Sequence, residues 1–160
     1  MAEEKFLNIL YKGLDMPDLT QNEADALIRV RKLFLDKTPL IVGGGNIQRE
    51  LQSQIRAEER FYLNIRQTAI EFGIFSSVTR FFSQPLVRIC IDKDMKHENP
   101  DGEIIEGSHI HLYREKFRDR FAIPLLKYGF DDSAGVTYCL GKFLEICNIE
   151  DIKINQQIRL

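Results

Sequence analysis

Hydrophobic and polar positions repeat with two different periods, and the change of period divides the chain into elements. After Leu19, apolar residues recur at helical spacing as far as Leu35. Thr20 and Glu23 stand at capping-box positions, where the Thr hydroxyl accepts a backbone N–H and the Glu carboxylate reaches back to the cap. The pattern predicts a helix over about residues 21–36, with Pro39 beyond its end.

The middle of the chain alternates instead, which is typical of half-buried strands. Alternation predicts strands at 61–65, 75–81, 86–92, 108–115 and 121–125, with Gly73 in a turn between the first two. The run Asn99-Pro100-Asp101-Gly102 has turn chemistry, since proline presets φ and glycine takes positive φ. We expect it to join strands 86–92 and 108–115 as an antiparallel pair with a long loop.

The pattern assigns secondary structure less clearly in the other segments. Residues 47–60 are compatible with either a helix or an irregular strand, whereas the glycines at 43–45 lack the Gly-Lys-Ser/Thr of a phosphate loop and predict a turn. A final helix is expected to begin near Asp131 and to end at Asn148 as its cap. Its apolar stripe consists of Val136, Cys139, Leu140, Phe143, Leu144 and Cys147.

The predicted fold class is α+β: an antiparallel sheet of about five strands with an N-terminal helix and a closing C-terminal helix. Residues 19–160 are expected to form a single domain. Residues 1–18, which contain Phe6, Leu7 and Tyr11, are expected to form an arm that docks on a partner. The last residues, 149–160, alternate weakly and are expected either to add an edge strand or to fray.

Composition narrows the class of protein. The chain has 160 residues and a formal net charge of -2, which argues against binding to nucleic acid through a strongly basic surface. No apolar run approaches the roughly 18–20 residues of a membrane span, so no membrane partner is expected. Three cysteines without a CxxC pair, Cys90, Cys139 and Cys147, indicate reduced thiols and a cytoplasmic location.

All three histidines fall between residues 97 and 111, in the stretch with the densest titratable side chains. In a strand over 109–115, His109, His111, Tyr113 and Glu115 would share one face. Arg114 would lie on the opposite face, where its stem can pack while its guanidinium reaches a carboxylate such as Asp92.

Three interpretations of this stretch remain open. His97, His109 and His111 would suit zinc, but His97 lies in a loop with no evident return to the strand, so the sequence assigns no metal and no cofactor. Alternatively, a histidine or a glutamate could act as base and a second histidine as acid in metal-independent RNA cleavage, with Arg114, Arg118 or Arg120 neutralising phosphate charge. The third interpretation is a structural network of Tyr113, Arg114 and Glu115 with Asp119.

Residues 97–122 resemble an uncharacterised family of small bacterial and phage proteins, a domain of unknown function. The family pattern His-x-Asn-Pro-Asp-Gly, then His-x-His-x-Tyr-Arg-Glu, then Asp-aromatic-Ala, corresponds to residues 97–102, 109–115 and 119–122 of this chain. The family often continues with Gly-Tyr-Gly, where this chain has Lys116-Phe117-Arg118. The resemblance implies a cytosolic protein that often travels on phage or other mobile DNA, and it supplies no activity.

The function expected from these observations is that of a non-enzymatic accessory protein of phage or mobile-element type. One form would be a counter-defence, anti-CRISPR-like inhibitor that binds a host or phage protein such as a nuclease or a nucleoprotein complex. The alternative is a toxin-type ribonuclease that uses His109, His111, Tyr113 and Glu115. The candidate binding residues are His97, His109, His111, Tyr113, Glu115, Arg118 and Arg120.

Overall fold

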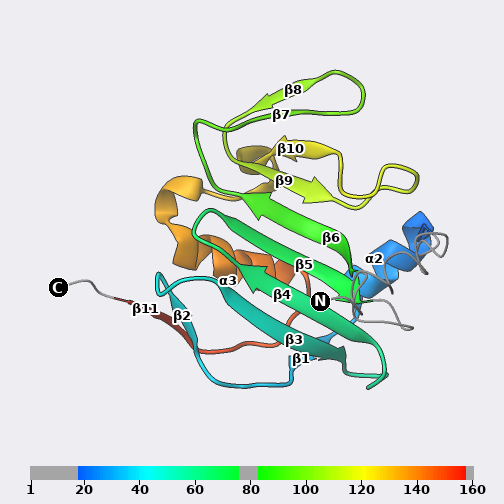
Figure 1. The fold of residues 1–160 in the computed structure, drawn as a ribbon, viewed down its shortest axis with the longest axis vertical. Helices are drawn as coiled ribbons and strands as arrows, with labels where there is room; N and C mark the ends of the chain where they lie inside the picture. Colours follow the sequence, from blue (N-terminus) through cyan, green and yellow to red (C-terminus); the bar gives the residue numbers. More distant parts are fainter. Residues whose placement is uncertain (1–17, 76–82, 158–160) are drawn as a thin grey trace, which may run out of the picture.

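A twisted sheet of mostly antiparallel strands, covered on one face by a helix, forms the body of the protein (Figure 1). The computed structural model describes residues 18–75 and 83–157. Within these ranges the elements are α2 (Gln21–Arg29), β1 (Lys32–Phe34), β2 (Leu40–Val42), β3 (Ile47–Ser53), β4 (Arg60–Ile65), β5 (Ala69–Phe75), β6 (Ser83–Cys90), β7 (Lys96–Glu98), β8 (Ile104–Glu106), β9 (His109–Leu112), β10 (Ala122–Pro124), α3 (Val136–Ile146) and β11 (Ile154–Gln156). Two short 3-10 helices, η1 (Leu125–Tyr128) and η2 (Asp132–Ala134), precede α3.

The α+β class is confirmed, but the main sheet has seven strands among the described residues, not about five. Their order is β1-β3-β4-β5-β6-β9-β10, and every neighbouring pair is antiparallel. Three of its strands do not correspond to predicted ones: β1, where the pattern predicts helix, β3, in the segment compatible with helix or strand, and β5, which ends where the predicted strand 75–81 begins.

The hydrophobic core lies between the sheet and α3. A row of isoleucines crosses the sheet on its inner face, because cross-strand pairing aligns Ile65, Ile70, Ile89, Ile110 and Ile123. The predicted apolar stripe of the closing helix packs against this face, with Val136 partly buried and the other members buried. The helix begins at Val136 rather than near Asp131, because η2 occupies the residues between them.

The N-terminal helix begins as predicted and ends earlier. Thr20 and Glu23 form both hydrogen bonds of the capping box. Helix α2 ends at Arg29, and Val30 is already extended. The chain then continues as β1, in which Lys32 pairs with Ser53 of β3. The apolar residues near 34 therefore belong to a strand, and the expected helix to residue 36 is wrong at its C-terminal end.

Gly73 lies inside β5 and not in a turn. A β-bulge falls between Phe72 and Gly73, where the register with β6 shifts. A Cβ atom at Gly73 would lie only 2.5 Å from the Tyr62 hydroxyl oxygen, so a side chain is sterically excluded there. The strand expected at 75–81 overlaps β5 only at Phe75, and its residues 76–81 lie outside the described residues.

Strands β6 and β9 pair antiparallel as expected, and the segment between them forms a hairpin of its own. Its two strands, β7 and β8, are joined by the predicted turn at Asn99-Pro100-Asp101-Gly102, in which the Gly102 N–H donates to the Asn99 carbonyl oxygen. The hairpin lies at the end of the sheet formed by β9 and β10 (Figure 1). This position brings the loop residues of the sequence motif back to the sheet.

The C-terminal segment adds an edge strand, since β11 pairs in parallel with β2. These two strands form a separate small sheet beside the main one (Figure 1). The arm predicted at 1–18 lies, except for Asp18, outside the described residues. None of the helices in the described part of the chain is long and apolar enough to cross a membrane.

Candidate functional site

The register between β6 and β9 places Cys90, His109 and His111 on one face of the sheet. Cys90 pairs directly with His109, and Arg88 pairs with His111. Residues two apart on a strand share a face, so these four side chains lie on the outer face, opposite the core face that holds Ile89. The sheet therefore gathers a thiol, two imidazoles and a guanidinium in one place.

The β7–β8 hairpin adds the third histidine. The ring centroid of His97 lies 4.7 Å from that of His111 and 5.5 Å from that of His109, and the His109 and His111 centroids are 4.9 Å apart. His97 Nε2 lies 2.8 Å from the backbone carbonyl oxygen of Arg120. We call these three residues the histidine cluster. Nothing in the sequence indicates that His97 returns to the strand, and the structure shows that the β7–β8 hairpin brings it there.

Backbone carbonyl groups fix the tautomers of the two strand histidines. The Nδ1 atom of His109 is 2.8 Å from the Gly107 carbonyl oxygen, and that of His111 is 2.8 Å from the Asp119 carbonyl oxygen. A carbonyl oxygen only accepts hydrogen bonds, so in each ring Nδ1 carries the hydrogen. In the neutral rings Nε2 then holds a lone pair.

Burial keeps these two rings neutral. His109 and His111 are 2% and 1% exposed, respectively. Desolvation, together with the smaller effect of the nearby Arg88 guanidinium, lowers the pKa of His111 to about 3. Burial likewise holds the pKa of His109 below its usual value, with the His97 and Arg88 side chains adding to the effect. Neither ring carries a proton on Nε2 at neutral pH.

The structure adds Cys90 to the site, a residue that the sequence alone did not link to the histidines. Among the described residues, the Cys90 sulfur and one ring nitrogen each of His109 and His111 all lie within 4.8 Å of one another. Burial raises the pKa of the Cys90 thiol, and the Arg88 guanidinium opposes this rise. Alternation in the sequence does place Cys90 on the face of Arg88, but its pairing with His109 depends on the register of a distant strand.

Asp119 belongs to the surroundings of the site rather than to the predicted network. Its carboxylate lies 3.7 Å from an Arg88 guanidinium nitrogen, and its backbone carbonyl holds His111. The ion pair therefore joins the loop before β10 to β6. This loop and the His111 ring are fixed by the same residue.

Tyr113 and Glu115 do not join the histidines. The strand predicted to 115 ends at Leu112, so the alternation of faces stops there. The Tyr113 hydroxyl donates to the Leu19 carbonyl oxygen at 2.8 Å. The Glu115 backbone N–H donates to Gln21 Oε1 at 3.1 Å, and its carboxylate accepts from the Gln21 N–H. Both residues hold the start of α2.

Arg118 and Arg120 likewise direct their side chains elsewhere. Arg118 Nε lies 2.8 Å from an oxygen of Asp18 in an exposed ion pair. Arg120 Nε donates to the Phe117 carbonyl oxygen at 3.2 Å, and only its backbone touches the histidine cluster. The structure therefore divides the predicted binding residues between two separate places.

Arg114 is exposed, and its expected packing beside Ile110 with a carboxylate partner is wrong. Its guanidinium carbon lies 4.3 Å from the centre of the Phe121 ring, not against Asp92. The reason is a tight turn after β9, in which the Arg118 N–H donates to the Arg114 carbonyl oxygen. The chain has left the strand before it reaches Arg114.

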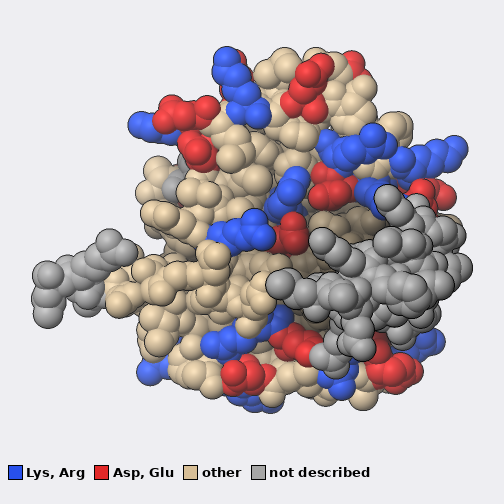
Figure 2. Space-filling model, viewed as in Figure 1, with Lys and Arg blue, Asp and Glu red and all other residues tan. Residues whose placement is uncertain are grey.

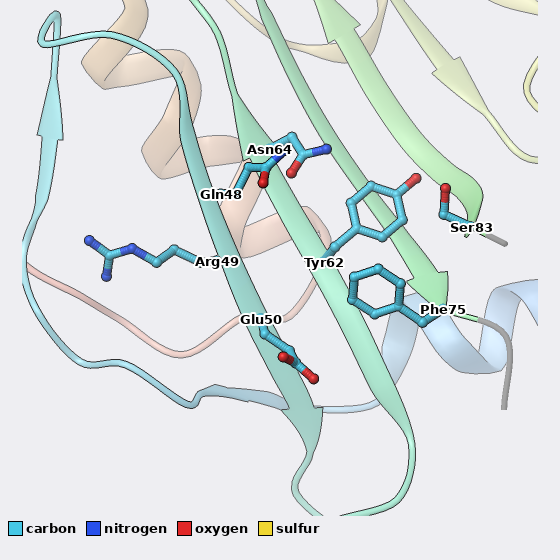
Figure 3. A pocket seen from close by; sticks show the side chains of 7 residues that line it. All are labelled: Gln48, Arg49, Glu50, Tyr62, Asn64, Phe75 and Ser83. Carbon is cyan, nitrogen blue, oxygen red and sulfur yellow. The ribbon is translucent and has the colours of Figure 1, made fainter. Parts of the chain in front are cut away.

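A second feature is a hollow of about 330 Å³ on the outer face of the sheet. The rings of Tyr62 and Phe75 lie side by side in it, with centroids 5.3 Å apart (Figure 3). Gln48 of β3 is the cross-strand partner of Asn64 of β4, and the side-chain amides of the two residues lie next to each other (Figure 3). We call this feature the outer-face hollow; its lining consists of Gln48, Arg49, Glu50, Tyr62, Asn64, Phe75 and Ser83.

Charged side chains of both signs are interspersed on the outer face. In Figure 2, Lys and Arg side chains lie among Asp and Glu side chains, and no continuous basic stripe crosses the described surface in this view. Nucleic-acid binding without sequence specificity relies on such a stripe.

These observations define an α+β protein in which a hairpin covers a cysteine–histidine site at one end of an antiparallel sheet. The chain belongs to a family of unknown function, DUF6978, whose sequence model matches residues 19–149. The resemblance to a family of unknown function is thus confirmed. Comparison with curated proteins and with solved structures returns no match.

Proposed function

We propose that this chain is a non-enzymatic binding protein that recognises a segment of another protein in the outer-face hollow. The observation that carries the proposal is the combination of paired aromatic rings, Tyr62 and Phe75, with the neighbouring amides of Gln48 and Asn64. Aromatic side chains dominate the binding energy of protein interfaces. Primary amides offer a donor and an acceptor side by side, which matches the peptide group.

The chemistry of the hollow favours a polypeptide over a phosphorylated ligand. Among the described residues that line the hollow, Arg49 is the one cation. The Arg49 guanidinium already donates to the carbonyl oxygen of Thr38 at 2.7 Å and to that of Asp36 at 3.3 Å. The other lining residues that the structure describes carry no positive charge to bind a phosphate group.

The geometry gives less support to a ribonuclease. RNA cleavage would require His109, His111, Tyr113 and Glu115 to meet at an open surface. His109 and His111 are instead buried beneath the β7–β8 hairpin, and Tyr113 and Glu115 contact α2. The proposal therefore keeps the accessory role expected from the sequence, with a nuclease or nucleoprotein complex of the host as the partner to test first.

The test is a quantitative pull-down from a lysate of the encoding organism. The wild type is compared with a Gln48→Arg/Asn64→Arg variant, which fills the hollow with two bulky cations. A Gln54→Arg/Gln67→Arg variant is the matched control, because it adds the same charge at exposed positions outside the hollow. A captured candidate is then purified and titrated against all three proteins.

The proposal predicts one protein that binds the wild type and the control stoichiometrically and binds the hollow variant at least tenfold more weakly. If that protein is a nuclease, its activity is measured with and without the bound chain. Equal binding of the partner to all three proteins would overturn the assignment of the hollow. RNA that is bound and cleaved by the wild type would overturn the non-enzymatic function itself.

A further inference from the structure

We propose that Cys90, His109 and His111 bind one transition-metal ion, with Zn²⁺ as the ion that suits them best. A thiolate and two imidazoles are ligands that zinc prefers. The proposal is independent of the outer-face hollow, which shares none of these residues.

The first argument is distance. The three ligand atoms lie within 4.8 Å of one another in the metal-free arrangement. Around a tetrahedral zinc ion, with bonds of about 2.0–2.3 Å, neighbouring ligand atoms are about 3.3–3.7 Å apart. Closing this difference takes about an ångström of side-chain movement, and the paired strands β6 and β9 need not move.

The second argument is the set of hydrogen bonds behind the ligands, which is independent of their distance. Metal-binding histidines commonly donate their other ring N–H to a backbone carbonyl or a carboxylate, and this fixes the ring and its tautomer. His109 and His111 both have this arrangement, through the carbonyl oxygens of Gly107 and Asp119. In each ring the nitrogen that remains, Nε2, is the one suited to bind the metal.

The third argument is enclosure. His109 and His111 are almost completely buried, and the His97 ring packs against both of them. Structural zinc sites are closed in this way, whereas catalytic sites keep a position open to substrate. Three ligands leave one tetrahedral position, and the His97 ring, which packs against both imidazoles, lies beside the ligand set and is not part of it.

The consequence is a cross-strand link that also fixes the sequence motif. The metal would join β6 to β9. The carbonyl groups that orient the ligand rings belong to the turn before β9 and the loop before β10. The ion would thereby stabilise the end of the sheet on which the β7–β8 hairpin lies.

The experiment measures metal directly. The purified full chain is stripped with a chelator, loaded with Zn²⁺, dialysed and analysed for metal per chain. Co²⁺ is then titrated as a spectroscopic probe, since a thiolate ligand gives a charge-transfer band and tetrahedral geometry gives intense d–d bands. The Cys90→Ala variant removes a proposed ligand. The Cys139→Ala variant is the control, because it removes a buried thiol of α3 outside the site.

The proposal predicts one Zn²⁺ per chain, a higher melting temperature with Zn²⁺, and a thiolate–cobalt band in the wild type and in Cys139→Ala. In Cys90→Ala the band is lost. The affinity for the metal falls by more than the roughly 10–100-fold that is typical when a hydrogen-bond partner of a ligand is removed. A stoichiometry near zero, or a Co²⁺ spectrum unchanged by Cys90→Ala, would overturn the proposal.

A second measurement uses only the wild-type protein, because the Cys90→Ala variant could fail to fold for reasons unrelated to metal. Thiol alkylation of the native wild type is followed by mass spectrometry with and without Zn²⁺. Zn²⁺ is expected to slow the alkylation of Cys90 at least tenfold. Alkylation of Cys90 at the same rate in both samples would contradict metal binding by its sulfur.

Discussion

The side-chain amide of Asn99 forms two hydrogen bonds with the backbone of Ala122: its Nδ2 donates to the carbonyl oxygen at 2.9 Å, and its Oδ1 accepts from the N–H at 2.8 Å. Asn99 follows β7 directly and Ala122 begins β10, so this pair fastens the hairpin to the sheet edge. Both hydrogen bonds are buried. The motif asparagine therefore holds His97, two residues earlier, at the histidine cluster.

Replacing Asn99 with Ala is expected to lower the free energy of unfolding by about 3 kcal/mol, because two buried backbone groups lose their partners. Chemical denaturation measures this change. The exposed Asn155 provides the control, and Asn155→Ala is expected to change stability by less than about 0.5 kcal/mol. Equal stabilities of the two variants would show that Asn99 does not fasten the hairpin.

Tyr113 provides a test that separates structure from catalysis. The Tyr113→Phe variant loses only the hydrogen bond to Leu19, so we expect a destabilisation of about 1 kcal/mol. RNA in the same preparation is expected to remain as intact as with the wild type. Tyr128→Phe, at a half-exposed position, is the control and should leave stability nearly unchanged. Cleavage by the wild type that Tyr113→Phe abolishes would restore the ribonuclease hypothesis.

Two glycines are expected to respond in opposite directions to substitution by Ala. A Cβ atom at Gly73 would meet the Tyr62 ring and the Gln84 carbonyl oxygen, so Gly73→Ala should destabilise by at least about 2 kcal/mol. Gly141 lies in α3 with no atom near its added Cβ, and Gly141→Ala should stabilise by about 0.5–1 kcal/mol. Thermal or chemical denaturation of both variants checks the pair.

Local chemistry predicted those parts of the fold that depend on near neighbours in the sequence. The start of α2 follows from Thr20 and Glu23, which bond within one turn. The end of α2 could not be predicted in the same way. The apolar residues near Phe34 fit a helical face as well as a short strand, and pairing of β1 with β3 decides between them.

The candidate site depends on contacts between distant segments, and for this reason the sequence revealed only part of it. The histidines were recognised as a group because they lie close together in the chain. Cys90 was missed because its link to His109 is a register between strands, and one residue of slip would turn it to the core. Tyr113 and Glu115 were wrongly grouped with the histidines, since nothing local indicates that β9 ends at Leu112.

Lys32 was not recognised from the sequence, although it is fully buried at the junction of β1 with both helices. Its ammonium group donates to the carbonyl oxygens of Ile28, Val30 and Cys147, at 2.7, 2.7 and 2.5 Å. It also lies over an aromatic ring, 4.8 Å from the Phe72 centroid. A buried lysine whose three donors are all used connects the end of α2 to the end of α3.

The pH dependence of stability should report this burial. Desolvation lowers the pKa of Lys32 to about 8 in the folded protein, below the ordinary value of 10.5 that applies to the unfolded chain. At pH 7 both states carry the proton. Between the two pKa values only the unfolded chain carries it, so the free energy of unfolding should rise with pH in this window.

The measurement compares the wild type with Lys32→Met, in which the titrating group is absent and other titrations cancel. The stability of the wild type relative to Lys32→Met is expected to increase by about 2 kcal/mol between pH 7.5 and 9.5, since one pKa unit corresponds to about 1.4 kcal/mol. A Lys153→Met variant, at an exposed position, should show no such difference from the wild type. A constant or decreasing difference for Lys32→Met would mean that the three carbonyl groups outweigh desolvation and keep the ammonium charged throughout this range.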